Sequence, residues 1–193
     1  EFVNLVRDYV QEGGTVIVCG LADYQDANSG SPHTTYEQVN KLLEAIGATM
    51  RVNDDELIDQ YDNGGQPYRL YFDDFNTGST DPVVQEVLKG VVDSGLRYSS
   101  YSGCSVAVGN GEAIVYGHDT TYSINSKNPA QGHNKPVLSY SDLYDSESAV
   151  VQKGDVVAMA TEPVGEGRVF LSGTVFCSNF EGAAEDQVSY SNG

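Results

Sequence analysis

The hydrophobic pattern of the first 47 residues predicts a helix, a strand and a second helix. Apolar side chains recur at helical spacing in the first stretch, at Phe2, Leu5, Val6, Tyr9 and Val10. This is the pattern of one apolar helix face, and Gly13 or Gly14 is suited to end the helix in a left-handed conformation. Residues 15–21 then form an apolar run. A run of this kind is typical of a central strand of a parallel sheet that is buried on both faces.

Start signals predict two further helices. Thr34 and Thr35 are each followed three residues later by Glu or Gln, which is the spacing of a capping box, and Gly47 ends that helix. Its inner face consists of Tyr36, Val39, Leu42, Leu43 and Ile46. Asp81 and Pro82 open the other helix, because proline is tolerated at the first helical position. Its apolar face consists of Val84, Val87, Leu88 and Val91.

The second half of the chain favours strands. Short apolar segments separated by Ser-Gly and Asn-Gly turns predict strands at 96–101, 105–108 and 113–116, after earlier ones at 49–52 and 68–72. Residues 156–160 and 168–174 flank a glycine-rich turn and predict a hairpin. Residues 125–136 are expected to be a polar loop and 181–193 a polar tail. The pattern shows no repeat and no linker, so residues 1–193 are expected to form one domain.

Charge narrows the classes of partner. The 28 acidic and 10 basic residues give a formal net charge of −18, which argues against binding to nucleic acid or to an anionic membrane surface. We find no apolar stretch long enough to predict a membrane span. The charge suits an extracellular or cell-surface protein, and a first residue other than Met predicts a mature or excised product.

Metal, cofactor and disulfide signals are weak. The acidic segments 53–56 and 142–147 carry oxygen ligands that suit calcium, but neither follows the calcium-loop pattern, so an acidic surface is expected and no cofactor is predicted. The three histidines lack the spacing of a zinc site. Cys19, Cys104 and Cys177 contain no C-x-x-C pair; they allow one disulfide, and the pairing stays open.

Several segments together resemble the class I glutamine amidotransferase-like superfamily. They are residues 9–18, 40–47, 156–158, 167–173 and 178–179. The sequence is most similar to the non-catalytic branch in gliding-motility and intraflagellar-transport proteins and in large bacterial surface proteins. The resemblance implies an α/β flavodoxin-like three-layer sandwich with a mostly parallel central sheet and an antiparallel, strand-rich C-terminal part. Such domains usually carry a strand before the first helix, so here either the boundary falls after that strand or it is supplied from elsewhere.

The resemblance also bears on catalysis. Catalytic members hold a cysteine in a Gly-x-Cys-x-Gly turn and a His-x-Glu pair late in the chain. Cys104 lacks both glycines at those offsets, and residues 176–181 contain no histidine. A working amidotransferase is therefore not expected. The alternative is a cysteine hydrolase in which Cys104, His118 and Asp119 converge through a hairpin. The interpretation that Cys104 is a core residue and that His118 caps a strand end is favoured over it.

A ligand site is expected where the first strand ends. Loops that follow parallel strands form the binding sites of α/β sheets, which points to Asp23, Tyr24 and Asp26, with Tyr101 as a further contact. The many tyrosines and acidic residues also suit a carbohydrate-binding module. The leading hypothesis is a non-catalytic accessory module of a secreted or surface multidomain bacterial protein. Similarity to modules attached to secreted nucleases or metallophosphoesterases names such neighbours, and a small molecule or glycan is the expected ligand.

Overall fold

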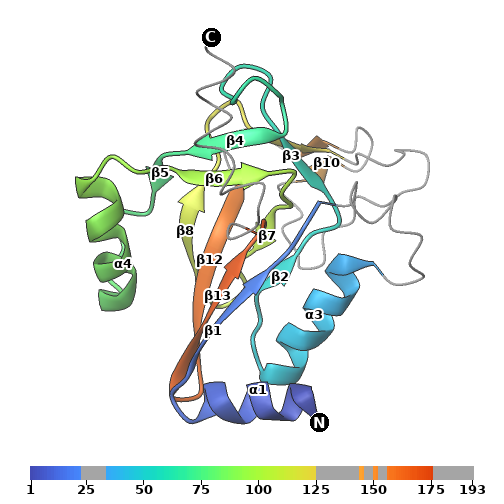
Figure 1. The fold of residues 1–193 in the computed structure, drawn as a ribbon, viewed down its shortest axis with the longest axis vertical. Helices are drawn as coiled ribbons and strands as arrows, with labels where there is room; N and C mark the ends of the chain where they lie inside the picture. Colours follow the sequence, from blue (N-terminus) through green and yellow to red (C-terminus); the bar gives the residue numbers. More distant parts are fainter. Residues whose placement is uncertain (23–33, 125–143, 146–149, 152–155, 176–193) are drawn as a thin grey trace.

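The main structural element is a five-stranded mixed sheet. The computed structural model describes residues 1–22, 34–124, 144–145, 150–151 and 156–175. The sheet has the order β1 (Thr15–Cys19), β13 (Gly167–Ser172), β12 (Val157–Val164), β8 (Glu112–Tyr116), β5 (Asp74–Phe75) (Figure 1). β1 and β13 are parallel, and every other neighbouring pair in this sheet is antiparallel.

The predicted flavodoxin-like sandwich with a mostly parallel sheet is therefore wrong. Parallel neighbours need a crossover connection of about a dozen residues or more, whereas only Gly165 and Glu166 separate β12 from β13, which makes this pair antiparallel. The hairpin predicted for this segment is confirmed. The helices in the described residues are α1 (Phe2–Gln11), α3 (Thr35–Ile46) and α4 (Pro82–Asp93).

The position of β1 also differs from the prediction. Among the described strands, β1 lies at the edge of the sheet, so it is not a central strand buried on both faces. Val16 and Val18 pack into the core on one face, while Ile17, on the other face, is 56 % exposed. The apolar run predicted the strand correctly and its surroundings incorrectly.

Four small antiparallel pairs complete the described strands. They join β2 (Arg51–Val52) to β7 (Val106–Ala107), β3 (Glu56–Ile58) to β9 (Tyr122–Ile124), β4 (Arg69–Phe72) to β6 (Tyr98–Tyr101), and β10 (Tyr144–Asp145) to β11 (Val150–Val151). Figure 1 shows the β4–β6 pair across one end of the large sheet and α1 across the opposite end. The strands predicted near residues 49–52, 68–72, 96–101 and 105–108 are thus present in shortened form.

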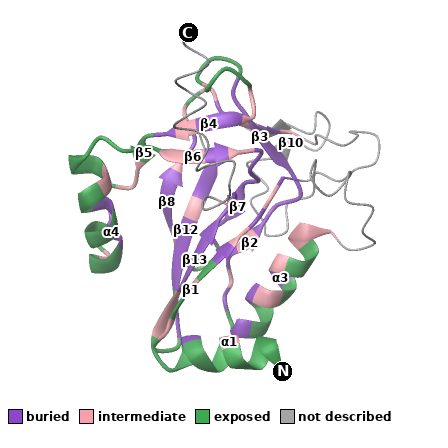
Figure 2. Cartoon of the chain, viewed as in Figure 1, coloured by how far each residue is buried: buried purple, intermediate pink, exposed green. Residues whose placement is uncertain are grey.

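Buried apolar residues form two cores, and Figure 2 shows the strands of the large sheet as mostly buried. One core lies beside α1 and α3 and includes Val10, Leu43, Ile46, Val52, Cys104 and Leu171. The other lies beside α4 and β4 and includes Leu70, Phe72, Val84, Leu88 and Phe170. Within the described chain, no helix has both the length and the apolar character that a membrane span requires.

The structure allows the predicted start and stop residues of each helix to be checked. Gly13 has φ of 106°, and Gly14 N donates to Tyr9 O at 2.8 Å, which confirms the left-handed end of α1. Asp81 caps α4 by accepting from Val83 N at 2.8 Å. Thr34 precedes α3 in an extended conformation as predicted, but its side chain makes no capping hydrogen bond, so the capping box is not formed.

Candidate functional site

Three strands of the large sheet terminate at the same end of the sheet. β1, β13 and β8 run in the same direction, because β12 is antiparallel to both β13 and β8. The loop that follows β6 crosses this end of the sheet. We call its residues 102–105 the strand-end loop. Ala22 N donates to Ser102 O at 3.0 Å, Leu57 N to Gly103 O at 2.8 Å, and Cys104 N to Gly173 O at 2.8 Å. The strand-end loop therefore joins the segments that follow β1 and β13 to β3.

Cys104 of the strand-end loop lies inside the protein. It is 0 % exposed, and its Sγ donates a hydrogen bond to Gly173 O at 3.3 Å. The side chain belongs to the core beside α1 and α3, and a Cβ added at Gly20 would lie 2.8 Å from the sulfur. A buried thiol that donates a hydrogen bond to a backbone carbonyl is in the environment of a structural cysteine.

A buried acidic segment lies beside the strand-end loop. Residues 53–56 are at most 6 % exposed, so the expected acidic surface is wrong for this segment. Asp55 accepts hydrogen bonds from Ser105 N at 2.8 Å and from the hydroxyls of Ser105 and Ser123, both at 2.5 Å. Asn53 Nδ2 donates to Ser105 Oγ at 2.9 Å. These hydrogen bonds explain how a carboxylate is tolerated inside the protein, because buried charge is costly unless it is hydrogen-bonded.

Ser102 has an unusual backbone conformation. Its φ is 49°, in the left-handed region that non-glycine residues rarely adopt, and it is 2 % exposed. Its hydroxyl donates to Glu56 Oε1 at 2.6 Å. Such strain persists only where the surroundings fix it, and it gathers at functional sites. The sequence signalled a turn at Ser-Gly here but gave no sign that Ser102 and Glu56 would meet.

A second polar cluster is centred on Asp59, which directly follows β3. Its carboxylate is 0 % exposed and accepts hydrogen bonds from the backbone N–H groups of Tyr61 (2.8 Å) and Asp62 (2.9 Å). The hydroxyls of Thr120 and Thr121 also donate to it, at 2.7 and 3.1 Å. Burial alone would raise the pKa of Asp59, but these hydrogen bonds favour the ionised form more strongly and hold the pKa below its ordinary value.

His118 lies within the same cluster. Its Nδ1 is 3.3 Å from Asp62 Oδ2 and 3.9 Å from Asp59 Oδ2, and its Nε2 is 3.4 Å from Asp73 Oδ1. The imidazole packs edge-on against Phe72, with ring centroids 5.3 Å apart. Phe72 belongs to the core beside α4, whereas Cys104 belongs to the core on the other face.

The structure also describes Asp119 and Tyr101 among the residues predicted for a site. Asp119 is exposed to solvent. Tyr101 is half-buried, with the Arg69 guanidinium 4.5 Å from its ring centroid and Tyr68 edge-on at 5.6 Å. One face of the Tyr101 ring is therefore occupied by a cation. Several predicted features lie outside the described residues: Asp23, Tyr24, Asp26, Cys177, the loop at 125–136 and the tail at 181–193.

The acidic clusters do not form a recognisable metal centre. Among the residues that the structure describes, no group of three or more His, Cys, Asp or Glu side chains has an arrangement that could hold a metal ion. Comparisons of the chain with protein-family models, curated proteins and solved structures found no match. The resemblance to the amidotransferase-like superfamily therefore stays a prediction.

The lowered pKa of Asp59 predicts a pH-dependent contribution to stability. In the unfolded chain this carboxyl titrates near 3.8, and in the fold its pKa is lower. The contribution is therefore complete above about pH 5 and is lost as the pH falls through the folded-state value. We expect Asp59→Asn to lower the free energy of unfolding by at least about 2 kcal/mol at pH 7.

Urea unfolding of the wild type and of Asp59→Asn at pH 7, 5, 4 and 3 measures this difference directly. The gap between the two proteins should stay constant down to pH 5 and then shrink. A gap of the same size at pH 3 would show that the substitution acts through packing and not through the charge of the carboxylate.

Proposed function

We propose that this chain is a non-catalytic binding module, whose ligand or partner is bound where β1, β13 and β8 end. The observation that carries the proposal is the state of Cys104. Its thiol is 0 % exposed and donates a hydrogen bond to Gly173 O. A cysteine nucleophile needs a sulfur that the substrate can reach. The environment of Cys104 therefore suits packing better than covalent chemistry.

The geometry of the strand-end loop supports binding where β1, β13 and β8 end. Carboxyl ends of parallel strands are where α/β sheets bind ligands, and β1 and β13 are the parallel pair of this sheet. Beside their ends, Ser102 is held in a strained conformation and bonds to the buried Glu56. Buried hydrogen bonds fix the position of this loop, so it gives rigid support to the residues around it, and a ligand held by those residues would bind at little ordering cost. The sequence places Asp23, Tyr24 and Asp26 directly after the described residue Ala22, which keeps them as proposed ligand contacts together with Tyr101.

The wider setting that we propose is a secreted or surface protein of several domains, with the other domains as partners. The net charge of −18 supports this setting, because such charge keeps a protein soluble and repels nucleic acid and anionic lipid. A saccharide that stacked on Tyr101 would need the ring face opposite Arg69, or would have to displace the guanidinium. A small polar ligand held by the residues that follow Ala22 needs neither.

Cysteine alkylation tests the proposal. We expect iodoacetamide, with peptide mass spectrometry across pH 5 to 9, to leave Cys104 unmodified in the folded protein and to modify it in denaturant. Cys19 is half-buried and serves as the internal comparison. Rapid modification of native Cys104 with an apparent pKa below about 8.5 would contradict the proposal, because only an activated thiol ionises so readily.

The stability and activity of Cys104→Ser also distinguish a binding module from a cysteine hydrolase. We expect the variant to lose about 1–3 kcal/mol of stability, because a hydroxyl replaces a thiol inside an apolar core. A hydrolase that uses Cys104 would instead lose turnover of ester or glutamine substrates while its melting temperature changed little.

A further inference from the structure

The two edges of the five-stranded sheet differ in how they are protected. β5 is two residues long and carries an exposed Asp74. Short length and charge are the usual means by which an edge strand avoids pairing with other chains. β1 is five residues long, with the sequence Thr-Val-Ile-Val-Cys, and contains no charge, proline or glycine. β1 has the composition of a strand that forms further pairs.

The register shows which backbone groups of β1 face outward. Gly20 N donates to Ser172 O at 2.7 Å, and Arg168 N donates to Gly14 O at 3.1 Å. The even-numbered residues of this segment therefore bond to β13, and the N–H and C=O groups of Thr15 and Ile17 point away from it. The Ile17 side chain is 56 % exposed. An added strand would find both hydrogen-bonding groups and apolar surface at this edge.

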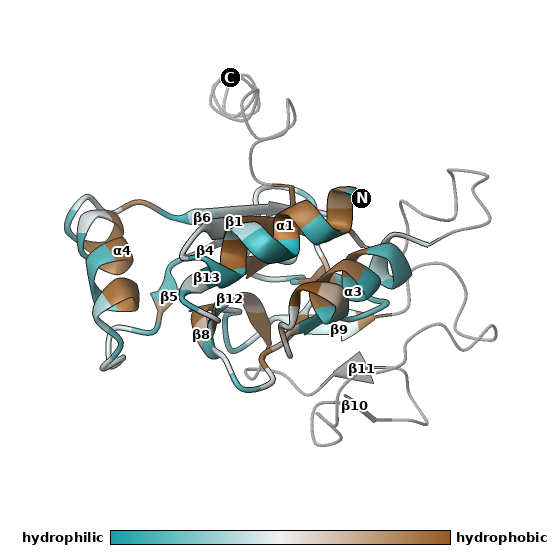
Figure 3. Cartoon of the chain, turned by 90° about the horizontal axis from the view of Figure 1, so that it is seen from below, coloured by the Kyte–Doolittle hydropathy of each residue, from teal (hydrophilic) through white to brown (hydrophobic). Residues whose placement is uncertain are grey.

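Helix α1 extends the same surface. Phe2, Leu5 and Tyr9 share one helix face and are 71 %, 65 % and 57 % exposed. The Tyr9 ring lies against Gly14, the residue before β1, because a Cβ added there would overlap the ring. Figure 2 shows α1 and part of β1 as exposed, and Figure 3 shows apolar residues along α1. We call these residues the β1 edge surface: Phe2, Leu5, Tyr9, Thr15 and Ile17.

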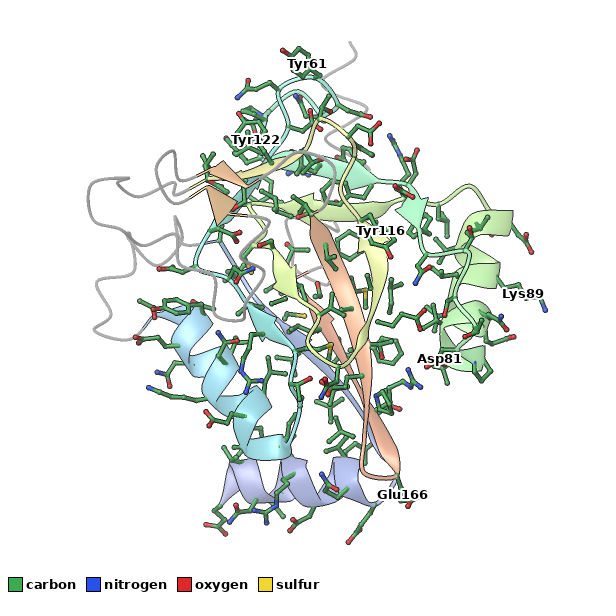
Figure 4. The ribbon with its side chains drawn as sticks, turned by 180° about the vertical axis from the view of Figure 1, so that it is seen from behind. Tyr61, Asp81, Lys89, Tyr116, Tyr122 and Glu166 are labelled. Carbon is green, nitrogen blue, oxygen red and sulfur yellow. The ribbon has the colours of Figure 1, made fainter. Side chains whose placement is uncertain are left out.

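Charge around the β1 edge surface indicates the kind of partner. Glu12 and Glu166 are exposed near the start of β1, and Figure 4 shows Glu166 at the hairpin beside α1. Neither forms an ion pair with another described residue, whereas Arg7 pairs with Asp8 at 2.9 Å and Arg168 with Asp81 at 2.7 Å. A second copy of this chain would bring another net charge of −18, which opposes self-association. A cationic strand is attracted instead.

We propose that the β1 edge surface binds an extended, lysine- or arginine-bearing segment of a partner protein as a sixth strand of the sheet. Backbone hydrogen bonds to Thr15 and Ile17 would hold the segment, as in other cases of strand addition. An apolar side chain of the segment packs beside Ile17, and its cationic side chains lie toward Glu12 and Glu166. This inference concerns a different surface from the strand-end loop, so either proposal can fail without the other.

Peptide binding tests the proposal. The probe is a hexapeptide of alternating lysine and valine with blocked ends, and the matched control carries glutamate in place of lysine. In amide NMR spectra of the labelled protein, we expect the lysine peptide to shift the signals of Thr15, Ile17 and α1. Binding should weaken as salt is added, and the glutamate peptide should bind at least tenfold more weakly. Equal binding of the two peptides, or no binding of either, would overturn the proposal.

Two variants at Ile17 test where the peptide binds. Ile17→Pro removes an outward N–H without removing a hydrogen bond to β13, and we expect at least a tenfold loss of affinity. Ile17→Lys retains the N–H and adds a positive charge, so it should weaken the lysine peptide and strengthen the glutamate peptide, even if the proline variant fails to fold. Unchanged affinity in both variants would contradict the site. A wild-type dimer in sedimentation equilibrium that Ile17→Lys abolishes would make a second copy the occupant and overturn the partner assigned here.

Discussion

Asp55→Ala is expected to destabilise the protein by about 3–5 kcal/mol, because three buried donors lose their acceptor at once. Asp55 is 0 % exposed and receives hydrogen bonds from Ser105 N, Ser105 Oγ and Ser123 Oγ. Ser105 belongs to the strand-end loop and Ser123 to β9, so the carboxylate joins two segments that are distant from it in sequence. Chemical denaturation monitored by circular dichroism measures the loss as a lower urea midpoint.

Two comparison variants make the Asp55 experiment specific. Asp119→Ala removes an exposed carboxylate and should change stability by no more than about 0.5 kcal/mol. Asp55→Asn retains one acceptor oxygen and should fall between Asp55→Ala and the wild type. Equal midpoints for Asp55→Ala and Asp119→Ala would show that the buried network contributes nothing to the fold. The strand-end loop would then need another explanation for its strained Ser102.

Local features of this fold could be predicted from the sequence. The left-handed end of α1 at Gly13, the Asp81 cap of α4 and the β12–β13 hairpin all involve residues within a few positions of each other. Their hydrogen bonds form between neighbours in the chain, so residue type and spacing determine them directly. The same reasoning fails at Thr34, which occupies the cap position of α3 without making the capping hydrogen bond.

Features that depend on distant residues could not be predicted. The acidic segment at 53–56 has the composition of an exposed loop, yet the hydroxyls that donate hydrogen bonds to Asp55 lie 50 and 68 positions further along the chain. Asn40 on α3 likewise bonds to both backbone groups of Val52, 12 positions away. For β1, the apolar run gave no information on whether the second face would be covered. A strand that pairs with a partner chain has the same composition as one buried in its own sheet.

In the candidate site, too, local features could be predicted and contacts between distant residues could not. Sequence spacing allowed Cys104 and His118 to converge, but the strands that separate them place the two side chains in contact with opposite cores. The local signal was a turn at Asn110-Gly111, where Gly111 N does bond to Val108 O at 2.9 Å. A turn determines that two strands reverse direction. It does not determine which face of the sheet each side chain reaches, because neighbouring residues of a strand point to opposite faces.

Gly167→Ala is expected to be strongly destabilising, although it adds only one methyl group. A Cβ at this position would overlap the backbone carbonyl oxygens of Gly14 and Val10. These atoms cannot rotate away as a side chain would, because Glu166 N bonds to Gln11 O and Arg168 N to Gly14 O, both at 3.1 Å. We expect a loss of at least about 4 kcal/mol, or no folded protein.

Gly90→Ala provides the matched control for the glycine experiment. Gly90 lies inside α4, and a Cβ added there meets no atom within 4 Å. Alanine favours helix over glycine, so this variant should gain about 0.5–1 kcal/mol. Thermal melts and soluble yield of the two variants compare the same chemical change in a crowded and an open position. If Gly167→Ala had the same melting temperature as the wild type, α1 and the start of β1 would have to move freely relative to β13. The β1 edge surface, which is built from those two elements, would then not be a pre-formed site for a strand.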